Sequence, residues 1–237
     1  MKTKQFSKVF AFLLALSFVL AACEPKPEPE KPLEAAEQAE RLSKYVNLCL
    51  ECMGKPSSFF IEKAEALGYT VEYDGEGLEY ACDEYCEIKN TDGIVSVGFV
   101  NNALSEGVVL YNFFDNYTYG ANLYVGVSNS IYDWGWEKWS FRFAPYEWDW
   151  ESWIQDSDST KRSEYLETAT NYLMNTTYPA CGITECYQNK WNDQYFVVHC
   201  YYYATNNSES ERPIQKDQKQ HSYIQVSFDT RSEPAIY

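Results

Sequence analysis

The order of helix-like and strand-like segments constrains the fold most strongly. Residues 33–53 carry apolar side chains at three- and four-residue steps, which predicts a helix, and a second helix is expected at 57–67. From Gly93 onward, short runs of β-branched and aromatic residues alternate with Asn, Gly and Asp turns. Strands are expected at 69–73, 78–88, 94–100, 108–114, 121–131, 184–190, 194–205 and 222–229.

One long helix interrupts this β-rich part at about residues 158–177, where Tyr165, Ala169 and Leu173 fall on one stripe. Asp158 is placed to cap it. Helices and strands are therefore segregated along the chain. Segregation predicts an α+β fold, in which N-terminal helices and the 158–177 helix pack on an antiparallel sheet of about six to eight strands. Residues 33–237 are long enough to form a single globular domain.

A faint internal repeat also runs through this domain. A helical segment leads to Cys82 and Cys86 and then to the strand 94–100. About a hundred residues later, a second helical segment leads to Cys181 and Cys186 and then to a strand near 195–202. Two copies of one helix–cysteine-pair–hairpin unit would produce this pattern, although few positions match and coincidence explains it equally well.

The first 23 residues have the features of an export signal. Lys2, Lys4 and Lys8 precede an almost unbroken apolar run, which is too short to remain as a membrane-spanning helix. The residues Leu20-Ala21-Ala22-Cys23 follow directly, and this segment resembles the lipobox of bacterial lipoproteins. The alternative is an ordinary secretory signal with a chance cysteine.

The resemblance implies that residues 1–22 are removed and that Cys23 becomes the lipid-bearing first residue. More than one acyl chain makes such an anchor stable. The expected location is the bacterial cell envelope, at the periplasmic or surface-exposed face of the outer membrane. Residues 23–32 contain four prolines, at positions 25, 27, 29 and 32, and are expected to form a semi-rigid tether.

The charge of the chain argues against a nucleic-acid partner. The full sequence has a formal net charge of −16, and removal of residues 1–22 takes away three lysines and no acidic residue. An acidic domain repels phosphate backbones. The expected partners are the membrane, through the N-terminal lipid, and either a saccharide or an envelope protein.

The seven cysteines after Cys23 are interpreted first as disulfide-forming residues, because an exported protein meets an oxidising compartment. Cys181 with Cys186 is one expected bridge, and Cys82 with Cys86 is another, although Cys82 and Cys86 could instead pair with Cys49 and Cys52. The odd cysteine, predicted to be a buried free thiol in a strand, is Cys200.

Two functional interpretations compete with the disulfides. Cys49-Leu50-Glu51-Cys52 has the spacing of a redox pair, but it lies near the end of a predicted helix, where the helix dipole disfavours a thiolate. The pairs Cys49/Cys52 and Cys82/Cys86 could also form a four-thiolate zinc site, which an oxidising compartment disfavours. No metal and no cofactor are therefore expected.

Residues 132–153 form the most unusual stretch, because they contain six of the seven tryptophans. In extended geometry Tyr132, Trp134 and Trp136 would share one face of a strand. Tyr146, Trp148 and Trp150 would likewise share an aromatic face, opposite the acidic face of Glu147, Asp149 and Glu151. Alternatively, a helix could begin at Pro145.

Aromatic faces beside carboxylates are typical of saccharide recognition, although tryptophans that simply fill the core would explain the pattern as well. The candidate ligand-binding residues are Trp134, Trp136, Trp148, Trp150, Glu147 and Asp149.

The sequence assigns no catalytic residue, since neither of the two histidines has a catalytic partner at a recognisable spacing and no nucleophile motif is present. The sequence therefore favours a lipid-anchored, non-catalytic binding module. The alternatives are an envelope enzyme that acts on carbohydrate or cell-wall material and a structural component that contacts other envelope proteins.

Overall fold

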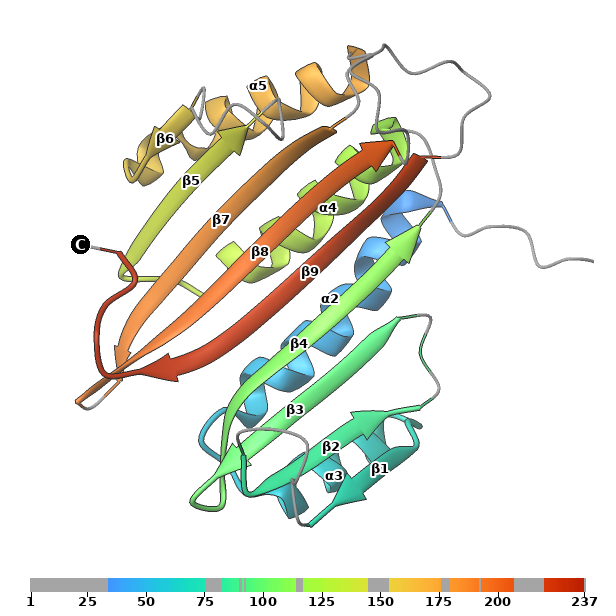
Figure 1. Cartoon of the computed structure of the whole chain (residues 1–237), viewed down its shortest axis with the longest axis vertical. Helices are drawn as coiled ribbons and strands as arrows, with labels where there is room; N and C mark the ends of the chain where they lie inside the picture. The colour runs from blue at the N-terminus through green and yellow to red at the C-terminus, as the bar shows by residue number, and fades with distance from the viewer. Residues whose placement is uncertain are drawn as a thin grey trace, which may run out of the picture. The chain divides into compact units, whose positions relative to one another are not determined.

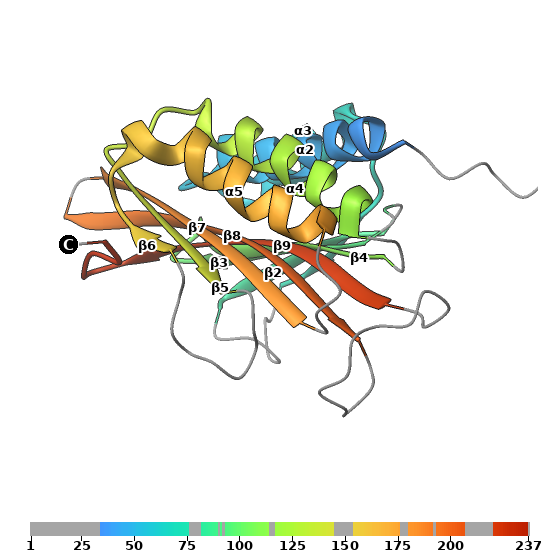
Figure 2. The same cartoon turned by 90° about the horizontal axis from the view of Figure 1, so that it is seen from above.

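The structure is a computed structural model, which describes residues 34–75, 82–89, 91, 93–113, 117–144, 154–175, 180–191, 193–206 and 220–236. These residues form an α+β fold, in which helices pack on one face of a nine-stranded sheet (Figures 1 and 2). All neighbouring strands are antiparallel. The predicted fold class is confirmed, with slightly more strands than expected.

Two helices open the fold close to their predicted limits. Helix α2 spans Ala35–Cys52 and α3 spans Ser57–Ala66. The second helix ends just before Gly68, close to the expected limit of residue 67, and Gly68 has φ = 84°, a conformation that glycine adopts without steric cost. The buried face of α2 includes Leu42, Val46 and Cys49, which follow the predicted three- and four-residue spacing.

Four strands follow and form one half of the sheet as a meander. They are β1 (Val71–Asp74), β2 (Glu84–Ile88), β3 (Ile94–Val100) and β4 (Ala103–Phe113). Val95, Val97 and Phe99 of β3 face the helices and are almost fully buried. This half of the sheet therefore forms the floor on which α2 and α3 pack.

The prediction of a strand at 121–131 is wrong, because these residues belong to helix α4 (Tyr117–Tyr132). Leu123, Tyr124, Val127 and Ile131 are completely buried, at steps of one, three and four residues. This spacing suits a helix that packs on a sheet, and tertiary packing overrides the β propensity of the segment. Gly126 allows the helices to approach closely, since a Cβ there would lie 2.6 Å from the Cβ of Ala39 in α2.

The second half of the sheet contains β5 (Lys138–Ala144), β6 (Ile154–Asp156), β7 (Ala180–Trp191), β8 (Gln194–Asn206) and β9 (Gln220–Arg231). The predicted long helix is confirmed as the 3₁₀ turn η1 (Ser159–Lys161) followed by α5 (Arg162–Asn175). The Asp158 side chain accepts a hydrogen bond from the Thr160 N–H at 3.1 Å, which confirms the predicted cap.

The strand order is β1-β2-β3-β4-β9-β8-β7-β5-β6, so β4 pairs with β9 at the middle of the sheet. Each half contains a three-strand meander that ends at this junction: β2-β3-β4 on one side and β7-β8-β9 on the other (Figure 1). Cys86 and Cys186 lie on β2 and β7, the first strands of these meanders. The internal repeat itself stays a prediction.

Candidate functional site

The segment after α4 corrects the first half of the predicted aromatic strand. Tyr132, Trp134 and Trp136 do not share a strand face, because α4 ends at Tyr132 and a turn follows in which Gly135 has φ = 75°. Trp134 is 43 % exposed, and its Nε1–H donates a hydrogen bond to Asn47 Oδ1 at 2.9 Å. Trp136 is half-buried. The two indoles therefore have different surroundings.

The other candidate residues of this stretch lie outside the described residues, as does the lipidation residue. They are Glu147, Trp148, Asp149, Trp150 and Cys23. Of the predicted ligand-binding residues that the structure describes, Trp136 lines a pocket, and this pocket is the candidate site.

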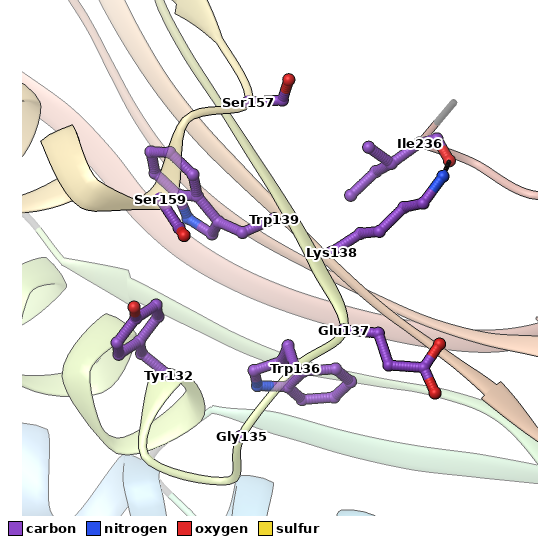
Figure 3. Close-up of a pocket in the computed structure, with 9 residues that line it drawn as sticks. All are labelled: Tyr132, Gly135, Trp136, Glu137, Lys138, Trp139, Ser157, Ser159 and Ile236. Atoms are coloured by element: carbon purple, nitrogen blue, oxygen red, sulfur yellow. Dashed lines mark hydrogen bonds between the residues drawn. The ribbon is translucent and has the colours of Figure 1, made fainter.

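This pocket has a volume of about 420 Å³ and lies where the turn after α4 enters β5 (Figure 3). Cavities of this size fall within the range of small-molecule sites, roughly 300–1,000 Å³. Aromatic rings and polar side chains converge on it from the turn, from β5, from the segment around η1 and from the C-terminal segment. The lining residues are Tyr132, Gly135, Trp136, Glu137, Lys138, Trp139, Ser157, Ser159 and Ile236.

Trp136 is held in place by contacts on the sheet side. Its ring centroid lies 5.5 Å from that of Tyr187 and 5.8 Å from that of Phe196, and both rings are tilted relative to the indole. Its Nε1–H donates to the Ile131 carbonyl oxygen at 2.7 Å. The indole N–H is therefore used internally, and the ring contributes an aromatic wall rather than a hydrogen-bond donor.

Trp139 joins the pocket to a buried polar cluster. The side chain is 3 % exposed, and its Nε1–H donates to Glu185 Oε1 at 2.9 Å. Glu185, on β7, is completely buried and accepts a second hydrogen bond on the same oxygen from Arg162 Nε at 2.8 Å. The ion pair between Arg162 and Glu185 lies directly behind the pocket wall.

The remaining groups of the cluster form hydrogen bonds with the second oxygen of Glu185 and with the other nitrogens of the Arg162 guanidinium. Glu185 Oε2 accepts hydrogen bonds from the Tyr124 hydroxyl, at 3.0 Å, and from Ser128 Oγ. Arg162 Nη1 donates to Asn129 Oδ1 at 2.9 Å, and Nη2 donates to Ser128 Oγ. A buried ion pair is tolerated when its polar atoms are hydrogen-bonded in this way.

Burial and the Glu185 carboxylate together raise the pKa of the Tyr124 hydroxyl well above its usual value. Tyr124 therefore remains a neutral hydrogen-bond donor at physiological pH. Burial lowers the pKa of Arg162, but the Glu185 carboxylate and the Tyr187 hydroxyl together outweigh this effect, and the pKa is raised. The Arg162 guanidinium therefore keeps its positive charge beside Glu185.

Arg162 also contacts the pocket wall directly. Its Cζ lies 4.3 Å from the centroid of the Tyr132 ring, which is a cation–π contact. Tyr132 is 36 % exposed and lines the pocket. The buried ion pair therefore fixes two walls of the pocket, through Trp139 and through Tyr132.

The polar rim consists of hydroxyls, one carboxylate and one amine. Lys138 Nζ donates to the Ile236 carbonyl oxygen at 3.2 Å, so the C-terminal segment closes one side (Figure 3). Glu137 Oε2 accepts from the Lys190 N–H at 3.2 Å. Ser157 and Ser159, in the segment around η1, provide hydroxyl groups. Such a rim offers both donors and acceptors to a neutral, hydroxylated molecule.

Sequence reasoning did not identify Glu185, Arg162 or Ser128. Glu185 did carry a signal, since it lies two residues from Ile183 and from Tyr187 and so falls on the apolar face of a strand. A carboxylate in that position requires a buried partner. Identifying Arg162 as this partner requires the tertiary fold, because it lies 23 positions away, at the start of α5.

The cysteine geometry corrects the predicted disulfides. Cys181 and Cys186 both lie on β7, and five residues of extended strand span about 16 Å, whereas a disulfide needs Cα atoms within about 7 Å. Cys82 lines a groove on the helix-free side of the sheet, whereas Cys86 is buried in the helix-side core. Cys82, Cys86 and Cys186 are free thiols, so neither predicted bridge fits this structure.

The other described thiols, Cys49, Cys52 and Cys200, are buried. Cys200 is a buried free thiol. Burial raises the pKa of Cys52 to about 11, with a contribution from Glu51, and raises that of Cys49 further. These shifts disfavour the thiolate that a redox pair needs. Nor do the Cys49/Cys52 and Cys82/Cys86 pairs come together as zinc ligands.

Two absences hold for the described part of the chain. There, no group of three or more His, Cys, Asp or Glu side chains is placed to hold a metal ion. In the same residues, no helix combines the length and the apolar character needed to span a bilayer. In comparisons with known proteins, no protein family, no curated protein and no solved structure matches this chain.

Proposed function

We propose that this chain is a lipid-anchored, non-catalytic binding module of the bacterial cell envelope, and that the pocket beside Trp136 binds a neutral saccharide. The observation that carries the proposal is the composition of this pocket. Tyr132, Trp136 and Trp139 supply ring surfaces, while Glu137, Ser157 and Ser159 supply polar groups around them. Sugar rings have apolar C–H faces that stack on aromatic rings and hydroxyls that need polar partners.

Rigidity of the walls supports the same proposal. Trp136 is fixed by Tyr187 and Phe196, and Trp139 by Glu185. A ligand therefore does not have to order these rings, which reduces the entropic cost of binding. For a shallow site of this kind we expect dissociation constants of about 10 µM to 1 mM, equivalent to roughly 4–7 kcal/mol.

The pocket proposal is tested with Tyr132→Ala in the full-length protein in detergent, against neutral oligosaccharides on a glycan array and then by titration. Loss of one stacking ring should weaken binding by roughly 3–10-fold, since aromatic contacts contribute about 0.5–1.5 kcal/mol. Tyr73→Ala is the matched control, because Tyr73 is 52 % exposed on β1 and does not line the pocket. A blank array, or equal affinity in the two variants, would exclude the saccharide site and favour a protein-contact role.

The anchoring part of the proposal has its own test. Cys23→Ser removes the sulfur that would carry the diacylglycerol, so the variant should not incorporate a fatty-acid label and should leave the membrane fraction. Metabolic labelling followed by fractionation of cells measures both effects. Equal labelling and equal membrane recovery in the variant would refute the lipid anchor, whatever the outcome of the saccharide experiment.

A further inference from the structure

The helix-free face of the sheet carries a second and larger cavity. All described helices lie on the other face (Figure 2). The cavity is a groove of about 730 Å³ over β2, β3, β4, β9 and β8. Strand register places Tyr85 opposite Gly98, Gly98 opposite Glu106, and Glu106 opposite Asp229 across its floor. We call it the acidic groove.

Small side chains make the floor of the acidic groove low. Ser96, Gly98 and Ser227 lie on its central strands. A Cβ on Gly98 would come within 3.1 Å of both Cys82 Cβ and Glu106 Cγ, so the glycine keeps this part of the floor clear. Larger side chains rise on both sides: Tyr85 and Glu87 from β2, and His199 and Tyr201 from β8.

The charge of the acidic groove is negative. Arg231 contributes one positive charge, but it is paired with Asp229, with Nη2 2.5 Å from Oδ2 and Nε 3.2 Å from Oδ1. Glu87 and Glu106 remain, and within the described residues no ion pair involves either of them. Lys89 interacts with Glu87 only weakly, since its ion pair is with Glu72. Two carboxylates without an ion-pair partner in a groove attract cationic groups.

The walls also suit a flat cation. The rings of His199 and Tyr201 are stacked, with centroids 5.7 Å apart and planes inclined by 16°. Burial lowers the pKa of His199, and Arg231 lowers it further, so the imidazole is neutral near pH 7 and does not repel a cation. A guanidinium is planar, so it stacks on aromatic faces and binds a carboxylate through two N–H groups at once. An ammonium lacks this planar, bidentate geometry.

The dimensions of the groove favour a chain over a single small cation. Four strand spacings separate β2 from β8, or about 19 Å. Glu87 on β2 and Glu106 on β4 are two strand spacings apart and offset by two residues along the strands, which together amount to about 12 Å. One amine cannot reach both carboxylates, whereas two arginines of an extended peptide can. The floor strands are paired on both sides, so recognition must use side chains rather than strand addition.

From this geometry we infer that the acidic groove binds an extended segment of a partner protein that carries two arginines. This site is independent of the saccharide pocket.

The probe is the peptide acetyl-Gly-Arg-Gly-Arg-Gly-amide, titrated into the full-length protein in a neutral detergent. Its affinity should fall at least tenfold when both arginines are replaced by citrulline, which keeps the shape of the side chain and removes the charge. Argininamide alone should also bind at least tenfold more weakly than the peptide.

Glu106→Gln locates the site and should weaken peptide binding by 3–10-fold. The matched control is Glu65→Gln, the same charge change at an exposed position of α3 on the other face of the sheet, which should leave the affinity unchanged. Should Glu106→Gln lower the melting temperature, Glu87→Gln replaces it. Equal binding of the citrulline peptide or of argininamide, or equal losses in the groove and control variants, would overturn the inference.

Discussion

Replacing Arg162 with Met should lower the free energy of unfolding by about 3–5 kcal/mol, because the change leaves the charge of Glu185 buried without its partner. The Glu185 side chain has no exposure, and that of Arg162 is only 8 % exposed. Met keeps much of the aliphatic volume of Arg, so the loss reports mainly on charge. Urea unfolding followed by far-UV circular dichroism measures it.

Arg142→Met is the control for this prediction, since Arg142 is exposed on β5 and its replacement should change stability by less than about 1 kcal/mol. Adding Glu185→Gln to Arg162→Met should recover part of the lost stability, because the second change removes the stranded charge. If Arg162→Met unfolds at the same urea concentration as the wild type, the ion pair does not stabilise this fold.

The sequence predicts most accurately the elements in which the spacing of apolar residues matches the spacing of buried residues. Helix α2 has a regular apolar stripe, and its buried residues follow that stripe. Helix α4 was missed because Tyr, Val and Ile, which favour strands on average, are buried there at helical spacing. A short apolar run is ambiguous between the two, and only the surface against which it packs decides.

The candidate site was predictable only in part, for a similar reason. Alternation of Trp134 and Trp136 predicted a strand, but Gly135 between them adopts a positive φ and turns the chain. Trp136, which was expected to bind a ligand from a strand face, lines the pocket from a turn instead, and its role in binding stays a prediction. The hydrogen bond that holds Trp139 comes from β7, far along the sequence, and no local pattern encodes such a long-range contact.

The second large effect is expected for Trp139→Ala, which should cost about 3–5 kcal/mol of unfolding free energy. The indole is 3 % exposed, its ring stacks 6.0 Å from that of Phe141, and its N–H donates to Glu185. The substitution therefore removes packing and also takes a donor from a buried carboxylate.

Trp134→Ala is the matched control, because it also removes an indole side chain. Trp134 is 43 % exposed in the adjacent turn, and its N–H donates to Asn47. This variant should lose no more than about 1 kcal/mol of unfolding free energy.

Trp139→Phe separates the contribution of packing from that of the hydrogen bond, because it keeps an aromatic ring in the core but lacks the N–H. Its stability should therefore lie between those of the wild type and Trp139→Ala. Equal midpoints in urea for Trp134→Ala and Trp139→Ala would mean that Trp139 does not link the pocket wall to the core. The rigidity on which the saccharide proposal depends would then have to come from Trp136 and its contacts with Tyr187 and Phe196.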